Sequence, residues 1–335
     1  MSETYTPLLS VIIPTHRRPH YLPRAIESAL RSSPNGSVEV IVIPNGIDKS
    51  WKAIADQYVS DKRVQWHPIR KAHGNTARNH GMALATGKYL RFLDDDDYLL
   101  PNSANQVKAL EDTNYDLCTG PIEVRKNSGD FIELRTPPPH VKNLTDLVIS
   151  TAGMSLPLSW TYRRSIIREF SWDESINTAQ DSAWLYTLAI EREYQYICLP
   201  RVIGVWIQHD EERISQKKCK SWHAKIWANM LLDTCNSLEQ KGRLTKKRKN
   251  LVARRLWTIV CGAYYTDPKW WKKIVSHALH FDPQARPDLA LYRLPLTKNI
   301  PPIFILNITT PLLLGRRVWR RLSKKIGIRK AIFHE

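Results

Sequence analysis

The sequence has little of what marks secreted, zinc-binding or membrane-spanning proteins. Its five cysteines lie far apart and form no C-x-x-C pair, which favours reduced cytosolic thiols over a disulfide framework or a zinc site. No apolar run reaches the roughly 18 residues that a bilayer span requires. The first residues, MSETYTPLL, lack the charged and apolar regions of a signal peptide. We therefore expect a protein that stays in the cytosol.

Common phosphate-binding and calcium-binding motifs are also missing. No G-x-G-x-x-G follows the first predicted strand, which disfavours a dinucleotide dehydrogenase. GMALATGKY at 81–89 departs from a P-loop because five rather than four residues separate its glycines, and Tyr89 replaces the Ser or Thr that would hold Mg²⁺. An EF-hand loop starting at Asp94 would place Leu99 and Asn105 where glycine and glutamate are needed.

Charge is distributed very unevenly along the 335 residues. Residues 1–212 hold 23 Lys and Arg against 26 Asp and Glu, a net charge of −3, whereas residues 213–335 hold 27 against 6, a net charge of +21. The basic third therefore points to an anionic partner: a membrane surface, nucleic acid or an acidic substrate.

Strands and helices alternate in the first hundred residues, which predicts an α/β fold with βαβ units and a mostly parallel sheet. The following residues add strands in a mixed arrangement, and the chain beyond residue 217 reads as helices. We expect two domains, an α/β domain at 1–216 and a helical, basic region at 217–335. The predicted strands are 8–14, 38–43, 64–67, 88–93, 115–119, 122–125, 131–135, 158–162, 194–199 and 202–207. The predicted helices are 20–30, 51–58, 76–85, 101–112, 180–191, 222–238, 244–265 and 268–279.

The segment Gly87–Pro101, GKYLRFLDDDDYLLP, ends a buried strand with four consecutive aspartates. Ligands of open parallel sheets bind beyond the carboxyl ends of the strands, and adjacent carboxylates need protons or a cation to offset their repulsion. Asp94 and Asp96 are spaced to face one side and would suit Mg²⁺ or Mn²⁺. The alternative is an acidic cluster at the start of the helix after Pro101.

Four segments together resemble the family 2 glycosyltransferases, which have a GT-A fold. SVIIPTHRRP, EVIVIPNG, GNTARNHGMALATGKYLRFLDDDD and QDSAWLYTLA occur in the order and approximate spacing of that family. The similarity covers residues 8–215, about two thirds of the chain.

The resemblance implies a site for a nucleotide-sugar donor. Pro14 and Thr15 correspond to the element that touches the nucleotide base, and Arg78 to an arginine that contacts the nucleotide. Asn45 stands where the family usually has an aspartate pair; it can still accept a hydrogen bond from a pyrimidine imide, or be only a turn residue. UDP is the expected nucleotide, with dTDP and GDP left open because of this departure. Asp94 and Asp95 are expected on the donor. Asp94 and Asp96 are expected to bind Mg²⁺ or Mn²⁺, with one of Asp95 and Asp97 instead capping the following helix.

Catalysis with inversion needs a base for the acceptor hydroxyl. Gln180-Asp181 resembles the Glu-Asp pair of the family, so Asp181 is the expected base. Alternatively, Asp181 is only an acidic residue at a helix N-terminus, where the helix dipole stabilises negative charge. His209 resembles a histidine that some members use on metal or phosphate, and is otherwise structural. Trp160 and Trp172 either stack on sugar rings or belong to the core.

The segment 300–327, IPPIFILNITTPLLLGRRVWRRLSKKIG, combines an apolar part too short to span a bilayer with a basic amphipathic helix. We expect it on an anionic membrane surface rather than packed on the enzyme, and we expect no nucleic acid because no known binding motif accompanies the charge. Its basic residues are Arg316, Arg317, Arg320, Arg321, Lys324 and Lys325.

The sequence thus predicts an inverting, metal-dependent glycosyltransferase that acts on a lipid-linked or lipopolysaccharide acceptor. We expect it at the cytoplasmic face of a bacterial inner membrane. A nucleotidyltransferase of related fold, or a non-catalytic membrane adaptor, is the alternative.

Overall fold

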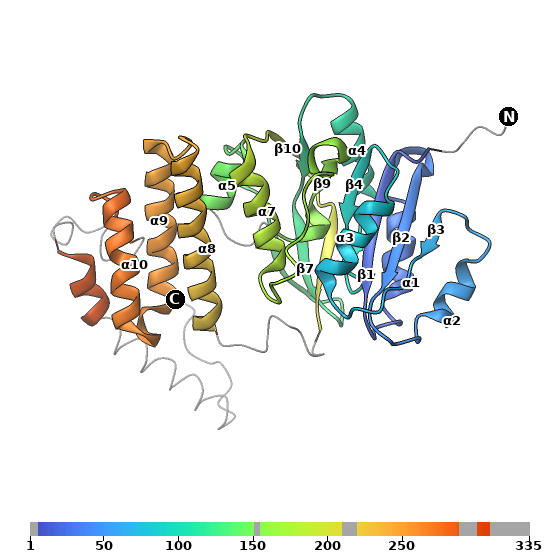
Figure 1. Ribbon diagram of the computed structural model, residues 1–335, viewed down its shortest axis with the longest axis horizontal. Helices are drawn as coiled ribbons and strands as arrows, with labels where there is room; N and C mark the ends of the chain where they lie inside the picture. Colours follow the sequence, from blue (N-terminus) through green and yellow to red (C-terminus); the bar gives the residue numbers. More distant parts are fainter. Residues whose placement is uncertain (1–5, 151–154, 210–219, 288–299, 309–335) are drawn as a thin grey trace, which may run out of the picture. The chain divides into compact units, whose positions relative to one another are not determined.

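The computed structural model describes residues 6–150, 155–209, 220–287 and 300–308 (Figure 1). The chain forms two compact units, residues 1–217 and residues 218–335. Within the described ranges, the strands belong to the first unit and the second unit is helical.

Seven strands of the first unit form one sheet in the order β10-β6-β9-β4-β1-β2-β3 (Figure 1). Neighbouring strands are parallel except around β9, which runs antiparallel to both β4 and β6. The predicted α/β fold with a mixed, mostly parallel central sheet is therefore confirmed. The strands are β1 Leu9–Thr15, β2 Val38–Pro44, β3 Val64–Trp66, β4 Tyr89–Phe92, β6 Leu117–Thr119, β9 Thr161–Arg163 and β10 Tyr196–Cys198.

Successive side chains of a strand point to opposite faces of the sheet. Helices cover both faces of this sheet, so the strands carry apolar residues on both. On one face, Val11 and Val40 join a core with α1 (Leu22–Leu30) and α4 (Ala104–Glu111). On the other face, α3 (Gly74–Leu84) lies so close to β1 that a Cβ added to Gly81 would come within 2.5 Å of Ile12.

The face of the sheet that α3 covers also carries α7 (Gln180–Glu191), whose Trp184 packs edge-on against Phe92 of β4. Trp184 also stacks on Trp172 at 4.8 Å between ring centres. This aromatic group holds the start of α7 beside the end of β4, which brings two parts of the predicted site together.

A second sheet of four strands has the order β5-β11-β7-β8. β5 begins directly after the four aspartates and pairs antiparallel with β11. The sequence prediction missed β5, because a strand of two residues has no periodicity of its own. The strands are β5 Tyr98–Leu99, β7 Ile122–Lys126, β8 Phe131–Arg135 and β11 Gly204–Gln208.

Short helices fill the connections of the first unit. The helix predicted at 51–58 is divided into α2 and a 3₁₀ turn, and α5 was not predicted. Asn143 accepts a hydrogen bond from the Asp146 amide at the start of α5, so an Asn before the apolar run LTDLVIS was the available signal. The α-helices are α2 Lys52–Ala55, α5 Leu144–Ser150 and α6 Arg164–Ile167, and the 3₁₀ turns are Pro34–Gly36, Asp56–Tyr58, Pro101–Ser103 and Pro157–Ser159.

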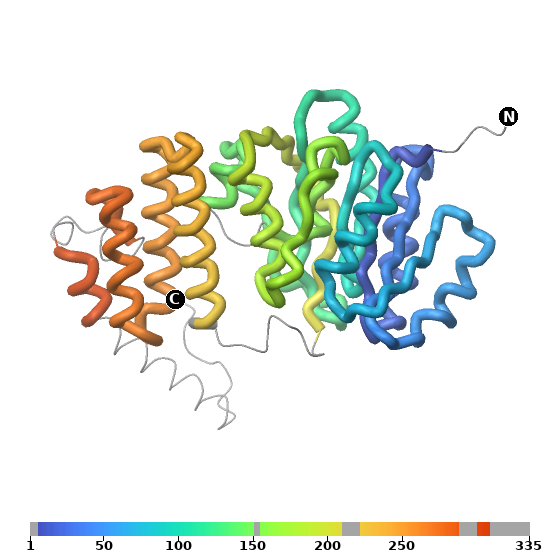
Figure 2. Tube along the Cα trace, in the orientation of Figure 1, coloured from blue at the N-terminus to red at the C-terminus, as the bar shows by residue number. Residues whose placement is uncertain are grey.

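The second unit contains α8 (Lys220–Gln240), α9 (Lys246–Ala263) and α10 (Pro268–Phe281), with α9 packed against both of the others (Figure 2). Trp257 and Trp271 are among its buried side chains. None of the helices in the described ranges is long and apolar enough to cross a membrane. The predicted basic helix beyond Ile308 lies outside the described residues.

Candidate active site

Three strands of the central sheet end at one edge and supply most of the predicted site. β1 pairs in parallel with β2 up to Thr15, opposite Pro44, and β4 pairs with β1 up to Phe92, opposite Ile12. The residues that follow these strands therefore meet beyond the carboxyl ends, where such sheets bind ligands.

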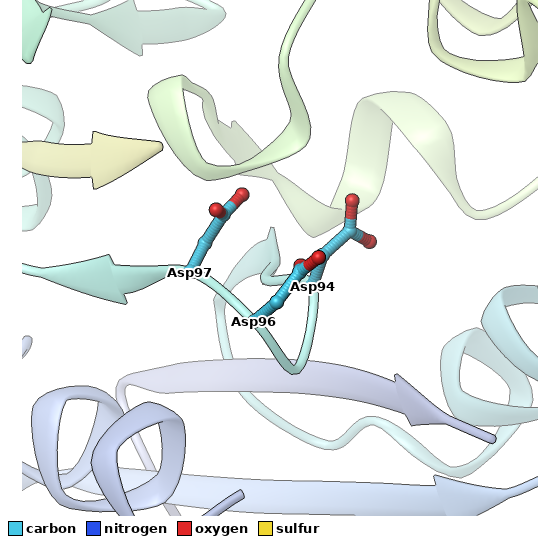
Figure 3. A group of neighbouring side chains, drawn as sticks. All are labelled: Asp94, Asp96 and Asp97. Atoms are coloured by element: carbon cyan, nitrogen blue, oxygen red, sulfur yellow. The ribbon is translucent and has the colours of Figure 1, made fainter. Parts of the chain in front are cut away.

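The carboxylates lie on one turn after β4, closed by a hydrogen bond from the Asp97 amide to the Asp94 carbonyl at 3.1 Å. One oxygen from each of Asp94, Asp96 and Asp97 lies within 4.8 Å of the others. Figure 3 shows these three side chains side by side on this turn. Three carboxylate oxygens so close together are the donor set that Mg²⁺ and Mn²⁺ prefer.

Two of the aspartates have structural partners. Thr15 donates from Oγ1 to Asp95 at 2.7 Å, and the Ile207 amide of β11 donates to Asp97 at 2.9 Å. Neither aspartate caps the next helix, because Leu100 occupies the position before it. That prediction was wrong: these carboxylates bind distant chain segments, which sequence spacing does not reveal.

Asp95 is completely buried. Burial raises the pKa of its carboxyl to about 7, although Arg18 and Thr15 oppose this rise. Asp95 is therefore not part of the cluster of Asp94, Asp96 and Asp97. The hydrogen bond from Thr15 and the charge of Arg18 offset the cost of burying its carboxylate.

His209 follows β11 and lies against the carboxylate turn. Its Nε2 is 2.7 Å from Oδ2 of Asp96, and its Nδ1 is buried with no hydrogen-bond partner among the described residues. The structure thus brings His209 to the carboxylates, where imidazole and carboxylate together fit a divalent cation.

Arg78 projects from α3 to the carboxylate turn. Its Nη2 donates to Oδ1 of Asp94 at 2.7 Å, and its Nη1 donates to Gln180 at 3.3 Å. Its guanidinium stacks over the ring of Trp172 at 4.6 Å. Burial by itself would lower the pKa of Arg78, but Asp94 and Asp181 outweigh burial and raise it. Arg78 is therefore a permanent cation that joins α3, the carboxylate turn and α7.

Asp181 lies in the first turn of α7, with its carboxylate 3.8 Å from Nη2 of Arg78. Burial raises its pKa to about 7; Arg78 opposes the rise and Asp94 adds to it. The turn that starts α7 has Ala179 at a φ of 55°, a left-handed conformation that costs an alanine energy. A carboxyl with a pKa near neutrality is suited to accept a proton.

Two of the residues expected to contact the nucleotide base lie around a narrow hollow between the loops after β1 and β2. Thr15, Asn45, Trp51 and Arg18 are among its lining residues. The Asn45 amide donates from Nδ2 to the Thr15 carbonyl at 2.9 Å, which leaves its Oδ1 as an acceptor. Pro14 is buried within β1 and supports this edge.

Of the two interpretations of Trp160 and Trp172, the structure supports membership of the core. Trp160 is 0% exposed and Trp172 is 2% exposed. Trp160 packs edge-on against Tyr196, and Trp172 stacks on Trp184. Stacking on a substrate ring is therefore excluded for both, since neither presents a free face.

Sequence reasoning missed two arginines of the site. Arg18 lies 2.5 Å from Oδ1 of Asp95 and 2.7 Å from Oδ2 of Asp96. Arg24 of α1 donates to the Asp96 carbonyl at 2.9 Å. Their partners are more than seventy residues away, and no local pattern marks such contacts.

Curated relatives carry the name glycosyltransferase. A Rickettsia bellii protein named an uncharacterized glycosyltransferase is 27% identical over 174 residues, 52% of this chain and 25% of the relative. The uncharacterized glycosyltransferase MJ1057 of Methanocaldococcus jannaschii is 25% identical over 203 residues, 59% of this chain and 70% of that protein. The chain thus spans about a quarter of the length of the Rickettsia bellii relative.

Solved structures share the fold. TarS of S. aureus, in complex with UDP-GlcNAc, superposes with a TM-score of 0.60 at 15% identity, covering 82% of this chain and 80% of that chain. The Pyrobaculum calidifontis mannosyltransferase PcManGT, in complex with GDP-Man and Mn²⁺, superposes with a TM-score of 0.50 at 16% identity, covering 96% and 84%. Residues 10–194 match the family described as Glycosyl transferase family 2. The chain therefore belongs to glycosyl transferase family 2.

Proposed function

We propose that the protein transfers a sugar from a nucleoside diphosphate donor to an acceptor hydroxyl, with inversion and with a divalent metal ion. The observation that carries this proposal is the arrangement around Arg78, which contacts Asp94 at 2.7 Å and lies 3.8 Å from Asp181. A donor-binding carboxylate and a base of raised pKa thereby face one another in one site.

The donor is proposed to lie along the edge formed by β1, β2 and β4. Its base would lie against the mouth of the hollow at Thr15 and Asn45, and its diphosphate would extend toward the carboxylate turn. Oδ1 of Asn45 can accept a hydrogen bond from the imide N–H of uracil, which supports a UDP-sugar. The two solved relatives differ in nucleotide, UDP-GlcNAc in TarS and GDP-Man in PcManGT.

Asp94, Asp96 and His209 are proposed to hold Mg²⁺ or Mn²⁺, with Asp97 as a further oxygen ligand. When bound, the ion would stabilise negative charge on the departing diphosphate. Arg78 holds the Asp94 carboxylate in place, so the ligand set is oriented by the protein before any donor arrives.

Asp181 is proposed to take the proton from the acceptor hydroxyl. The hydroxyl oxygen forms the new bond to the anomeric carbon as the bond from that carbon to the diphosphate oxygen breaks, and the electron pair leaves with the nucleoside diphosphate. Attack opposite the leaving group inverts the configuration at that carbon. The raised pKa of Asp181 matches this role near neutral pH.

The acceptor is proposed to be a lipid-linked or lipopolysaccharide glycan, reached by binding of the basic C-terminal third to the cytoplasmic face of the inner membrane. The net charge of +21 over residues 213–335 supports this proposal, because each basic residue near an anionic surface contributes about 1 kcal/mol.

The test is to incubate the protein with Mn²⁺ and a panel of UDP-, dTDP- and GDP-sugars, ranked beforehand by thermal shift. We expect release of the nucleoside diphosphate, and release of pyrophosphate would instead indicate nucleotidyl transfer. Asp181→Asn should lower turnover by about 10²- to 10⁴-fold while leaving donor binding intact. Asp130→Asn, an exposed aspartate on the β7–β8 turn, is the matched control. Equal turnover in both variants would rule out Asp181 as the base.

A further inference from the structure

Arg18 holds two aspartates of the carboxylate turn with one guanidinium group. Its Nη2 lies 2.5 Å from Oδ1 of Asp95, and its Nη1 lies 2.7 Å from Oδ2 of Asp96. The same Oδ2 is 2.7 Å from Nε2 of His209. A protein cation thus already binds an oxygen that belongs to the proposed metal ligands.

The two carboxylates differ in how easily they can release Arg18. Asp95 has a side chain that is 0% exposed, and a buried carboxylate without a counter-charge is very costly. Asp96 is 12% exposed and offers its carboxylate to the cluster with Asp94 and Asp97. A metal ion can therefore replace Arg18 at Asp96, whereas nothing in the described residues replaces it at Asp95.

Arg18 also lines the hollow proposed for the nucleoside, together with Thr15 and Asn45. It consequently lies between that hollow and the carboxylate turn, where a diphosphate would pass from one to the other. Its side chain is 29% exposed, so its guanidinium is accessible to a ligand. Guanidinium N–H groups donate strong, charge-assisted hydrogen bonds to phosphate oxygens.

We propose that Arg18 is a diphosphate-binding residue that Asp96 occupies until metal and nucleotide arrive together. This inference rests on the proposed function. When both bind, Nη1 exchanges the Asp96 oxygen for a phosphate oxygen, and Nη2 remains on Asp95, which acts as the positioning residue. Arg18 then opposes binding of the metal alone and favours binding of the metal with the nucleotide.

The test measures Mn²⁺ and UDP binding directly, without turnover. Free Mn²⁺ is followed by electron paramagnetic resonance during titration of the full chain without nucleotide, and UDP affinity is measured by calorimetry at saturating Mn²⁺. Arg18→Gln is compared with Arg31→Gln, which removes the same charge from an exposed side chain outside the hollow. Arg18→Lys keeps a cation for Asp95 but cannot bridge both carboxylates, so it guards against loss of folding in the glutamine variant.

We expect both Arg18 variants to bind Mn²⁺ alone about tenfold more tightly and UDP with Mn²⁺ about tenfold more weakly than Arg31→Gln. Weaker binding in both titrations would mean that Arg18 only organises the aspartates, and unchanged binding in either titration would also overturn the proposal. If the unmodified protein binds UDP equally well with and without Mn²⁺, the metal part of the proposed function fails. If the unmodified protein binds Mn²⁺ and needs it to bind UDP, but the Arg18 variants do not raise the affinity for Mn²⁺ alone and lower the affinity for UDP, only the role of Arg18 fails.

Discussion

Nη2 of Arg78 lies 3.8 Å from the Asp181 carboxylate and lowers its pKa against the effect of burial. Asp181 must be deprotonated to accept a proton, so activity should fall as the pH drops below about 7. Arg78→Met removes the opposing charge and should move this acidic limb to higher pH, in addition to weakening the donor contact. Arg78→Lys should move it less. The pH dependence of kcat in the three proteins checks this, and an identical limb in all of them would contradict it.

Asp96→Asn tests the metal ligands. The substitution retains a hydrogen-bonding oxygen near His209 but removes the charge that a divalent cation needs. We expect UDP binding to lose its dependence on Mn²⁺, with an affinity about tenfold or more lower at saturating Mn²⁺. Calorimetry with and without the metal measures this, with Asp130→Asn as control. Full metal dependence in the Asp96 variant would exclude it as a ligand.

Gly81→Ala tests the packing of α3 on β1. The added Cβ would lie 2.5 Å from Cγ2 of Ile12, and such overpacking costs about 1–3 kcal/mol. The gain of helix propensity returns about 1 kcal/mol, so we expect a net loss of up to about 2 kcal/mol in the free energy of unfolding, measured in urea. Gly262→Ala in α9 is the control, because its Cβ meets no atom within 4 Å. That variant should be slightly stabilised.

Glu174 links the segment before α7 to Thr76 and Asn79 of α3 and to Lys71 in the loop before α3. Hydrogen bonds from these residues lower its pKa to about 2. A depressed pKa in the folded state stabilises the protein above the unfolded pKa, about 4.3, and this contribution disappears as the pH falls toward 2. Glu174→Gln should therefore destabilise the protein at pH 7 by less than about 1 kcal/mol, since the pair is exposed.

The pH dependence is the discriminating measurement for Glu174. The difference in unfolding free energy between the wild type and Glu174→Gln should shrink steadily below about pH 4. A difference that stays constant across this range would show that ionisation of Glu174 does not contribute.

Truncation after Ile308 tests the membrane proposal. This end point keeps Ile305 and Leu306, which are buried, and Asn307, which accepts a hydrogen bond from Tyr264 at 2.8 Å. Removing only the basic segment should release the protein from anionic vesicles in sedimentation. High salt should release the full chain as well. Equal sedimentation of both chains with anionic vesicles would refute the proposal.

The parts of the fold that follow local patterns were predictable from the sequence. Apolar runs such as 38–43 became central strands, and the order of motifs predicted a glycosyltransferase fold with Asp94, Asp181 and Arg78 in one region. The structure brings these three residues together. Local pattern was sufficient here because parallel strands of one sheet end at a common edge.

The parts that depend on distant contacts were not predictable. Arg18 pairs with Asp95 and Asp96, and Asp97 accepts a hydrogen bond from the Ile207 amide. Nothing in the spacing of HRRP or DDDD identifies these partners. β5 forms only because β11 lies beside it. Tertiary contacts, rather than propensity, decide such features.

The hydrogen bonds around Asp96 also bear on the order in which the protein is made. Asp96 lies 78 residues after Arg18 and 113 residues before His209, and Asp97 takes its amide partner from a strand 110 residues later. Domains form as units during synthesis, and contacts between distant residues form late. A nascent chain that ends before β11 therefore contains every carboxylate of the turn but not the finished ligand set. The proposed metal centre can be completed only when the last strand of the first unit has emerged.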